Sequence, residues 1–240
     1  MQSRSVVAGL ALVVFAASPG MAAGTLVEPH MHIAKGGDTP QVALTLDACM
    51  GGVDMRILDR LIEDEVPATV FVTGRWLKGN AAALALMLKH PELFEIEDHG
   101  LNHVPAVTDG ERPYGIAPAG SVDAVIAEVD DGAAMVAQAT GHRPTWYRDA
   151  TALYSPDAIP LIAKLGFHVA GFSLNADFGA TASAKLAAAR LESAQDGDVI
   201  IAHLNQPTRA SGEGIAEGID ALKAKGYRFV RLIDVAEVAD

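Results

Sequence analysis

The sequence has 240 residues, half of them hydrophobic and a fifth charged, which is enough apolar material to bury one sizeable core without covalent staples. Its formal net charge of −12 repels phosphate groups, and no Lys/Arg cluster offsets it. The composition therefore indicates one globular domain and excludes nucleic acid and an anionic membrane surface as expected partners.

The first 23 residues are predicted to be a secretion signal peptide. Arg4 precedes an apolar run over residues 6–17, and small residues around Met21 resemble a cleavage site. A membrane anchor is the alternative, but a span needs about 20 apolar residues and Pro19 ends this run earlier. We therefore expect a soluble, secreted or periplasmic protein with no membrane association after cleavage. Cys49 is the only cysteine, so no intramolecular disulfide is expected.

Residues 24–40 show no clear periodicity and are predicted to be an irregular lead-in lying over the surface. His30 and His32 lie within it. A His-x-His pair is compatible with metal binding, but in a mobile terminal segment we expect no metal site.

From residue 41 onward, strand-like and helix-like patterns alternate to the end of the chain. The predicted strands are residues 41–47, 69–73, 94–97, 145–148, 167–174, 199–204 and 228–232. The predicted helices are residues 56–66, 81–89, 121–140, 156–165, 182–194 and 214–225. Parallel strands need crossover connections, which helices normally supply, so a parallel sheet is indicated.

About seven such units over residues 41–240 suit a closed or nearly closed α/β barrel. A doubly wound open sheet is the alternative, but no Gly-rich turn has the dinucleotide-binding spacing. In a barrel the active site forms where the strands end. The predicted strand ends carry reactive side chains, namely Asp47, Asp98, His99, Arg148, Asp149, Asn175, Asp177 and His203.

His99 and His103 are four residues apart. On one turn of helix this spacing would put both imidazoles on the same face, at a separation that suits a divalent metal ion. The spacing alone is often coincidental. Its position at a strand end beside acidic residues favours a metal site.

With these residues in place, the chain resembles the polysaccharide deacetylases with the NodB homology domain, also called carbohydrate esterase family 4. The resemblance runs from about Gln41 to Leu232. It rests on five short segments in the same order, which are residues 44–47, 95–103, 146–148, 171–177 and 200–203.

The resemblance implies a distorted (β/α) barrel that removes N-acetyl groups from a glycan such as peptidoglycan or a chitin-like oligosaccharide, with the help of a divalent metal ion, usually zinc. It implies that Asp47 is the general base and that Arg148 orients it. His99 and His103 would hold the metal, and His203 would be the general acid. A histidine suits the acid step because its ordinary pKa of about 6.5 lets it carry a proton at working pH.

The first motif departs from the family, because Ala48 stands where a second aspartate usually provides the third metal ligand. The candidates to replace it are Cys49, Asp98 and Asp54, or Asp47 itself. We rank Cys49 first because it is close in sequence and a thiolate is a good zinc ligand. The alternative for Cys49 is a small, buried hydrophobic residue.

Two further departures concern the later motifs. Asn175 stands where an aspartate commonly tunes the acid histidine, so Asp177 is the predicted partner of His203. Asp149 adds a carboxylate that could pair with Arg148 or replace the lost ligand charge.

Two other functions stay open beside the deacetylase. One is a glycan-binding barrel that lost catalysis together with the ligand at Ala48, and the other is an amide hydrolase with a non-sugar substrate. The retention of an acid, a base and an orienting residue favours activity. Asn205 and Gln206 follow His203 directly and are candidates for substrate contact.

Overall fold

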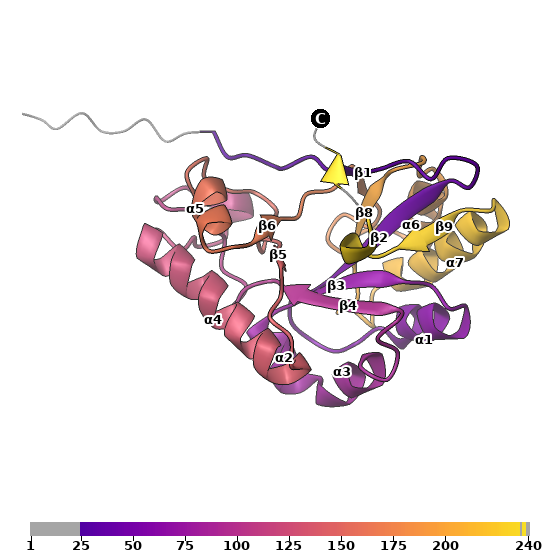
Figure 1. Cartoon of the computed structure of the whole chain (residues 1–240), viewed down its shortest axis with the longest axis horizontal. Coiled ribbons are helices and arrows are strands. Elements are labelled where there is room, and N and C mark those ends of the chain that lie inside the picture. The colour runs from indigo at the N-terminus through magenta and orange to yellow at the C-terminus, as the bar shows by residue number, and fades with distance from the viewer. Residues whose placement is uncertain (1–24, 236, 239–240) are drawn as a thin grey trace, which may run out of the picture.

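A computed structural model describes residues 25–235 and 237–238; the predicted signal peptide lies outside the described residues. The strands of the main sheet run in the order β6-β5-β4-β3-β2-β8-β7, with β9 also paired to β2, and all of these pairs are parallel (Figure 1). These strands are β2 (Gln41–Ala48), β3 (Ala68–Val72), β4 (Phe94–Asp98), β5 (Trp146–Tyr147), β6 (His168–Val169), β7 (Leu174–Asn175), β8 (Val199–His203) and β9 (Arg228–Val230). The predicted distorted α/β barrel of about seven parallel strand units is confirmed.

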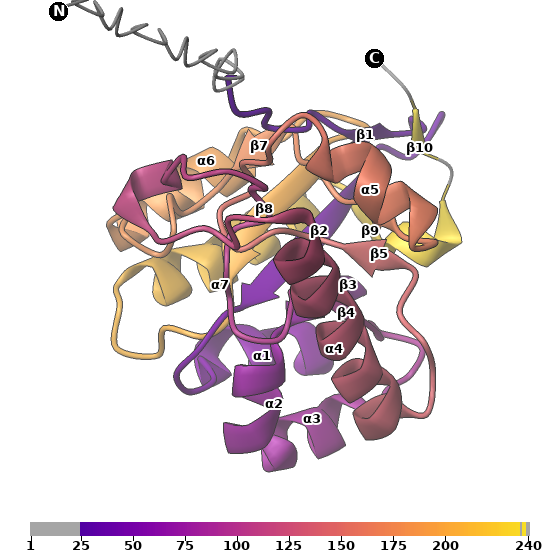
Figure 2. The same ribbon diagram turned by 90° about the vertical axis from the view of Figure 1, so that its left-hand side faces the viewer.

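Helices cover the outer face of this curled sheet (Figure 2). They are α1 (Met55–Glu63), α2 (Gly74–Gly79), α3 (Ala81–Met87), α4 (Val122–Thr140), α5 (Ala158–Lys164), α6 (Ala184–Glu192) and α7 (Ser211–Ala224), with short 3-10 turns at Pro113–Gly115 and Leu232–Asp234. Among the described residues, no helix has the length and apolar character that crossing a bilayer requires.

Strand alternation divides the buried side chains into two sets. On β2, Leu44, Leu46 and Ala48 face outward and join the core under the helices. Ala43 belongs to a separate cluster inside the barrel, with Phe71 of β3. The interior face of β2 continues through Thr45 to Asp47, so the same face that fills the barrel ends in a reactive carboxylate.

The prediction of one continuous strand over residues 167–174 is wrong. The segment forms two short strands, β6 paired with β5 and β7 paired with β8. Between them the chain crosses the open seam of the barrel, where a Cβ on Gly171 would clash with the carbonyl oxygen of Pro29. The lead-in approaches the backbone too closely there for a continuous ladder.

The prediction that residues 24–40 lie over the surface is also wrong for part of this lead-in. Met31 and Ile33 are each 2% exposed and pack inside the barrel. The lead-in forms a backbone bridge between Val27 and Tyr154, and its strand β1 (His32–Ile33) pairs antiparallel with β10 (Glu237–Val238). It therefore packs along the open seam as part of the fold.

The helix α2 escaped prediction because glycines stand at both of its ends and weaken its helical pattern. Its N-terminus is nevertheless well capped, since the Thr73 side chain accepts a hydrogen bond from the Trp76 N–H. The expected end of the helix α4 is borne out, because Gly141 adopts the left-handed conformation (φ 81°) after the last turn.

Candidate active site

The centre of the site is an ion pair at the end of β2. Arg148 is fully buried and its Nη1 donates to Asp47 Oδ1 at 2.9 Å and to Thr45 Oγ1 at 2.8 Å. The guanidinium stacks over the Phe71 ring at 4.4 Å, and its Nη2 donates to the Gly171 carbonyl at 3.0 Å. The side chain is held on all sides, so it fixes the orientation of the Asp47 carboxylate.

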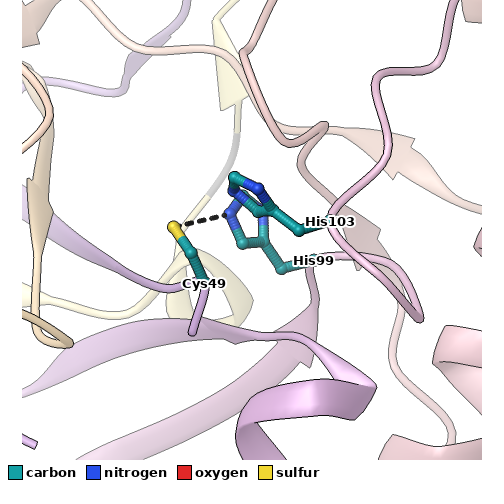
Figure 3. A group of neighbouring side chains, drawn as sticks. All are labelled: Cys49, His99 and His103. Carbon is teal, nitrogen blue, oxygen red and sulfur yellow. Dashed lines mark hydrogen bonds between the residues drawn. The ribbon is translucent and has the colours of Figure 1, made fainter. Parts of the chain in front are cut away.

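Beside this pair lie one thiol and two imidazoles. Nε2 of His99 lies 3.4 Å from Cys49 Sγ and 3.9 Å from Asp47 Oδ2. The ring of His103 packs edge-on to that of His99, with centroids 5.1 Å apart. Figure 3 shows the three side chains of Cys49, His99 and His103 converging from the segments that follow β2 and β4.

The prediction that one helical turn brings His99 and His103 together is wrong. Residues 99–103 are irregular, with left-handed backbone at Gly100 (φ 82°) and His103 (φ 63°). The Glu128 carboxylate holds this loop by accepting the N–H groups of Asn102 and Val104 at 2.7 and 3.1 Å. The rings converge because the loop folds back on itself.

A second acid–base pair stands at the end of β8. Nδ1 of His203 lies 3.0 Å from Asp177 Oδ1, and the His203 backbone N–H donates to Asp177 Oδ2 at 2.7 Å. The structure thus places Asp177 beside His203, as expected. Asn175 instead accepts the Phe178 N–H at 2.8 Å, and among the described residues no hydrogen bond joins its side chain to the histidine.

Opposite charges face one another across the site. Burial would raise the pKa of Asp47, but the positive charges of Arg148, His99 and His203 outweigh it and hold that pKa below its usual value. Burial likewise opposes ionisation of Cys49, yet His99 and the neighbouring imidazoles lower the pKa of the thiol well below 9.0.

The histidines show the reciprocal effect. Burial would lower the pKa of His99, but Asp47 and Cys49 raise it to about 9. Burial would also lower the pKa of His203, but Asp177 and Cys49 outweigh this effect and raise the pKa well above 6.5. The site side chains by themselves therefore favour two anions held among protonated imidazoles.

The candidates for the third metal ligand lie in different places in the structure. Asp98 and Ala48 lie on the outward-facing side of their strands, and Asp98 Oδ1 accepts the Gly100 N–H at 2.9 Å. Asp54 caps α1 and forms an ion pair with Arg56 at 2.5 Å. Only Cys49, among the candidates for the third ligand other than Asp47, lies with the two histidines.

Cys49, His99 and His103 also fit a metal ion by their chemistry. One donor atom from each lies within 4.8 Å of the others, and one thiolate with two imidazoles is a donor set that zinc accepts. Nδ1 of His99 lies 2.8 Å from the Arg148 carbonyl, which leaves Nε2 directed at the site. Nε2 of His103 is buried and makes no hydrogen bond to any described residue.

The Asp149 carboxylate makes structural hydrogen bonds and does not take part in the site. Its Oδ1 accepts the Ala106 N–H, and its Oδ2 accepts the N–H and hydroxyl of Thr151 at 2.8 and 2.7 Å. Its own N–H donates to the Tyr154 hydroxyl at 2.8 Å. The carboxylate makes no ion pair with Arg148 in the described structure.

The site opens into a pocket of about 540 Å³. Asn205 and Gln206 line it, as their position after His203 suggested. Sequence reasoning missed other parts of the wall. Glu28 and Tyr114 come from segments far from the motifs, whereas Phe172 lies within the 171–177 segment and Phe178 follows it. No local pattern marks these residues, because only the folded loops bring them to one rim.

Known proteins match both the sequence and the fold. The family model described as polysaccharide deacetylase matches residues 34–170, a span that includes the ion pair and the Cys49, His99 and His103 group but ends before Asp177. No curated protein matches the chain significantly.

Several solved structures share the fold. PdaA of Bacillus subtilis, a family 4 carbohydrate esterase, is 21% identical with a TM-score of 0.67, covering 86% of this chain and 84% of that one. The Bc1960 peptidoglycan N-acetylglucosamine deacetylase is 19% identical with a TM-score of 0.69, covering 85% and 91%. BA3943 of Bacillus anthracis, a family 4 pseudoenzyme, is 19% identical with a TM-score of 0.67, covering 82% of this chain and 66% of its own.

Proposed function

The chain belongs to the polysaccharide deacetylase family, and on this premise we propose that it is a metal-dependent hydrolase that removes N-acetyl groups from a glycan such as peptidoglycan or a chitin-like oligosaccharide. One observation carries the proposal. A base with its orienting cation, a three-donor metal group and a histidine with its carboxylate all meet at one end of the barrel, and Asp47, Cys49, His103 and His203 line one pocket.

Cys49, His99 and His103 would hold the metal, for which we propose zinc because of the thiolate. When bound, such an ion lowers the pKa of water towards about 7 and polarises the acetyl carbonyl. Because metal ligation requires a deprotonated imidazole and a thiolate, binding would displace the proton from His99.

Asp47 would take the proton from the attacking water. Arg148 occupies Oδ1, so Oδ2, which lies 3.9 Å from His99 Nε2, is the oxygen left to accept it. The lowered pKa of Asp47 keeps the carboxylate ionised, as a general base requires. Arg148 thereby positions the base and keeps it charged.

His203 would supply the proton to the departing amine. Asp177 binds Nδ1, which leaves Nε2 as the nitrogen available to the substrate. The raised pKa of His203 keeps it protonated at neutral pH, which is the state that a general acid needs. We also propose, from the N-terminal sequence pattern alone, that the protein acts outside the cytoplasm, as a secreted or periplasmic enzyme.

The second candidate function is glycan binding without catalysis. It is favoured by Ala48, whose methyl group packs under the helices where the family usually has a carboxylate ligand. A binding protein would hold N-acetylated oligosaccharides equally well with and without metal.

One experiment separates the two. The mature protein is stripped with a chelator and reloaded with zinc, cobalt or manganese, and acetate release from chito-oligosaccharides, peptidoglycan and simple acetamides is measured beside the Asp47→Asn variant. The proposal expects metal-dependent release from the glycans that Asp47→Asn abolishes. Release from simple amides alone would indicate a non-sugar amidase, and metal-independent binding without release would establish the binding protein.

A further inference from the structure

The lead-in brings a carboxylate to the rim of the pocket and fixes it there. Val27 exchanges backbone hydrogen bonds with Tyr154 at 2.8 and 2.9 Å. The Pro29 carbonyl accepts the Phe172 N–H at 3.3 Å. Glu28 lies between these two anchored residues, so its position on the rim is set by the barrel seam.

Glu28 is the one lining carboxylate that lacks a cationic partner in the part of the chain that the structure describes. The other lining carboxylate, Asp47, is neutralised by Arg148. Among the described residues that line the pocket, none is Lys or Arg. Glu28 is exposed and lines the pocket, so its charge lies at the rim within reach of solvent.

Three arginines contact residues on or beside the rim, and each is already engaged there. Arg75 Nη1 contacts Met50 Sδ at 3.3 Å. Arg112 donates twice to the Gly115 carbonyl, at 3.1 and 3.3 Å. Arg190 stacks over the Phe178 ring at 4.7 Å and donates to the Asn175 carbonyl. Among the described residues, none of these three arginines lines the pocket, so Glu28 stays an unneutralised charge at its rim.

The remaining rim suits the apolar faces of sugar rings. Tyr114 is 74% exposed and Phe178 is 46% exposed, and both line the pocket together with Ile116 and Phe172. Aromatic rings bury large areas and stack well against flat, weakly polar surfaces. The pocket thus combines apolar walls with one negative charge at its edge.

We infer that Glu28 is a specificity-determining residue: it disfavours glycans whose sugars carry a carboxylate, such as N-acetylmuramic acid, and favours N-acetylglucosamine chains, most of all those that already contain a free amino sugar. The inference rests on the proposed function. Each deacetylation leaves an ammonium group on the product, so a carboxylate at the rim would make a partly deacetylated chain a better substrate than a fully acetylated one.

The test compares three soluble oligosaccharides of equal length with the zinc-loaded protein. They are a neutral N-acetylglucosamine oligomer, the same oligomer with one glucosamine, and a peptide-free strand that alternates with N-acetylmuramic acid. Both kcat/KM for acetate release and the calorimetric Kd are measured for the wild type, for Glu28→Gln and for Glu63→Gln. Glu63 is exposed on α1, so its variant makes the same charge change away from the pocket.

The wild type should prefer the cationic chain over the neutral one and the neutral one over the anionic one. Each preference should shrink by about two- to fivefold in Glu28→Gln, as expected for an exposed charge pair, and stay unchanged in Glu63→Gln. The same preferences in Glu28→Gln as in the wild type would overturn the inference. Absence of acetate release with Glu28-dependent affinities would overturn the proposed function alone, and absence of binding would overturn both.

Discussion

Two clusters of buried polar side chains lie inside the same barrel, one beyond the carboxyl end of β4 and one along the strand itself. Beyond the carboxyl end, His99 belongs to the site with Asp47 and Arg148. Along the strand, Glu95 accepts the Thr69 hydroxyl at 2.6 Å, and Glu97 accepts the N–H groups of Thr145 and Trp146 at 2.8 and 2.7 Å. Both carboxyl groups are nearly as buried as Asp47.

The two clusters differ in what balances the carboxylates. Asp47 faces a guanidinium and imidazoles, which lower its pKa. Burial raises the pKa of both glutamates, and that of Glu97 reaches about 8 because Glu95 lies beside it. Buried acids alone thus do not mark a functional site. Cationic partners and an opening to a pocket distinguish the reactive cluster from the structural one.

The strongest test of this contrast removes the cation from the reactive cluster. Arg148→Met should leave Asp47 buried and uncompensated, and destabilise the fold by about 3–5 kcal/mol. Acetate release should fall at least about 100-fold, since the base is neither oriented nor held ionised. Urea unfolding and single-substrate kinetics measure the two effects.

Two further variants show whether the charge is the cause. Arg143 is exposed and pairs with Asp130 at 3.7 Å, so Arg143→Met should cost less than about 1 kcal/mol. The double variant Asp47→Asn with Arg148→Met should recover much of the stability, because no unpaired charge remains buried. If the double variant is no more stable than Arg148→Met, uncompensated charge is not the reason for the loss.

The histidine at the end of β8 should matter for catalysis more than for stability. His203→Gln should lower kcat about 100-fold, as expected for loss of a general acid. Asp177→Asn should act through the histidine. Since Asp177 raises the pKa of His203, its loss should move the alkaline limb of the pH–rate profile to lower pH. An unmoved alkaline limb in Asp177→Asn would argue that His203 is not the titrating acid.

The third prediction concerns the metal group. Cys49→Ser should weaken zinc binding by at least about tenfold, while Cys49→Asp should retain binding with a harder oxygen ligand. Because Cys49 is the only cysteine, any thiolate-to-cobalt absorption of the cobalt-loaded protein must come from it. That band should be present in the wild type and absent from both variants. Its absence from the wild type would show that the thiolate is not a ligand.

The sequence was sufficient for the barrel because alternation and helical periodicity are local signals. It was not sufficient where backbone contacts between distant segments decide the structure. The split between β6 and β7 depends on the approach of Pro29 to Gly171. The meeting of His99 with His103 depends on left-handed backbone that spacing alone does not reveal.

Strand alternation was an unused signal for the direction of Ala48 and Asp98. Asp47 faces the barrel interior, so Ala48 packs under the helices, and Asp98 lies on the same outward side of β4 as Phe94. Cys49 lies beyond the last residue of β2, so only the fold shows that it joins the histidines. Glu28 and Tyr114 offered no comparable signal, because their place on the rim is set entirely by tertiary contacts.

The last prediction concerns the structural cluster. Burial raises the pKa of Glu97 to about 8 in the fold against an ordinary value of 4.5, so between these values the folded state binds more protons than the unfolded state. Stability should therefore fall as pH rises from about 4.5 to 8. Glu97→Gln keeps the acceptor for both N–H groups without a titrating proton, so the difference in unfolding free energy between variant and wild type should grow across this range. The exposed Glu92→Gln provides the control. Parallel pH profiles for wild type and Glu97→Gln would show that Glu97 is ionised in the fold and that the two clusters differ less than their contacts indicate.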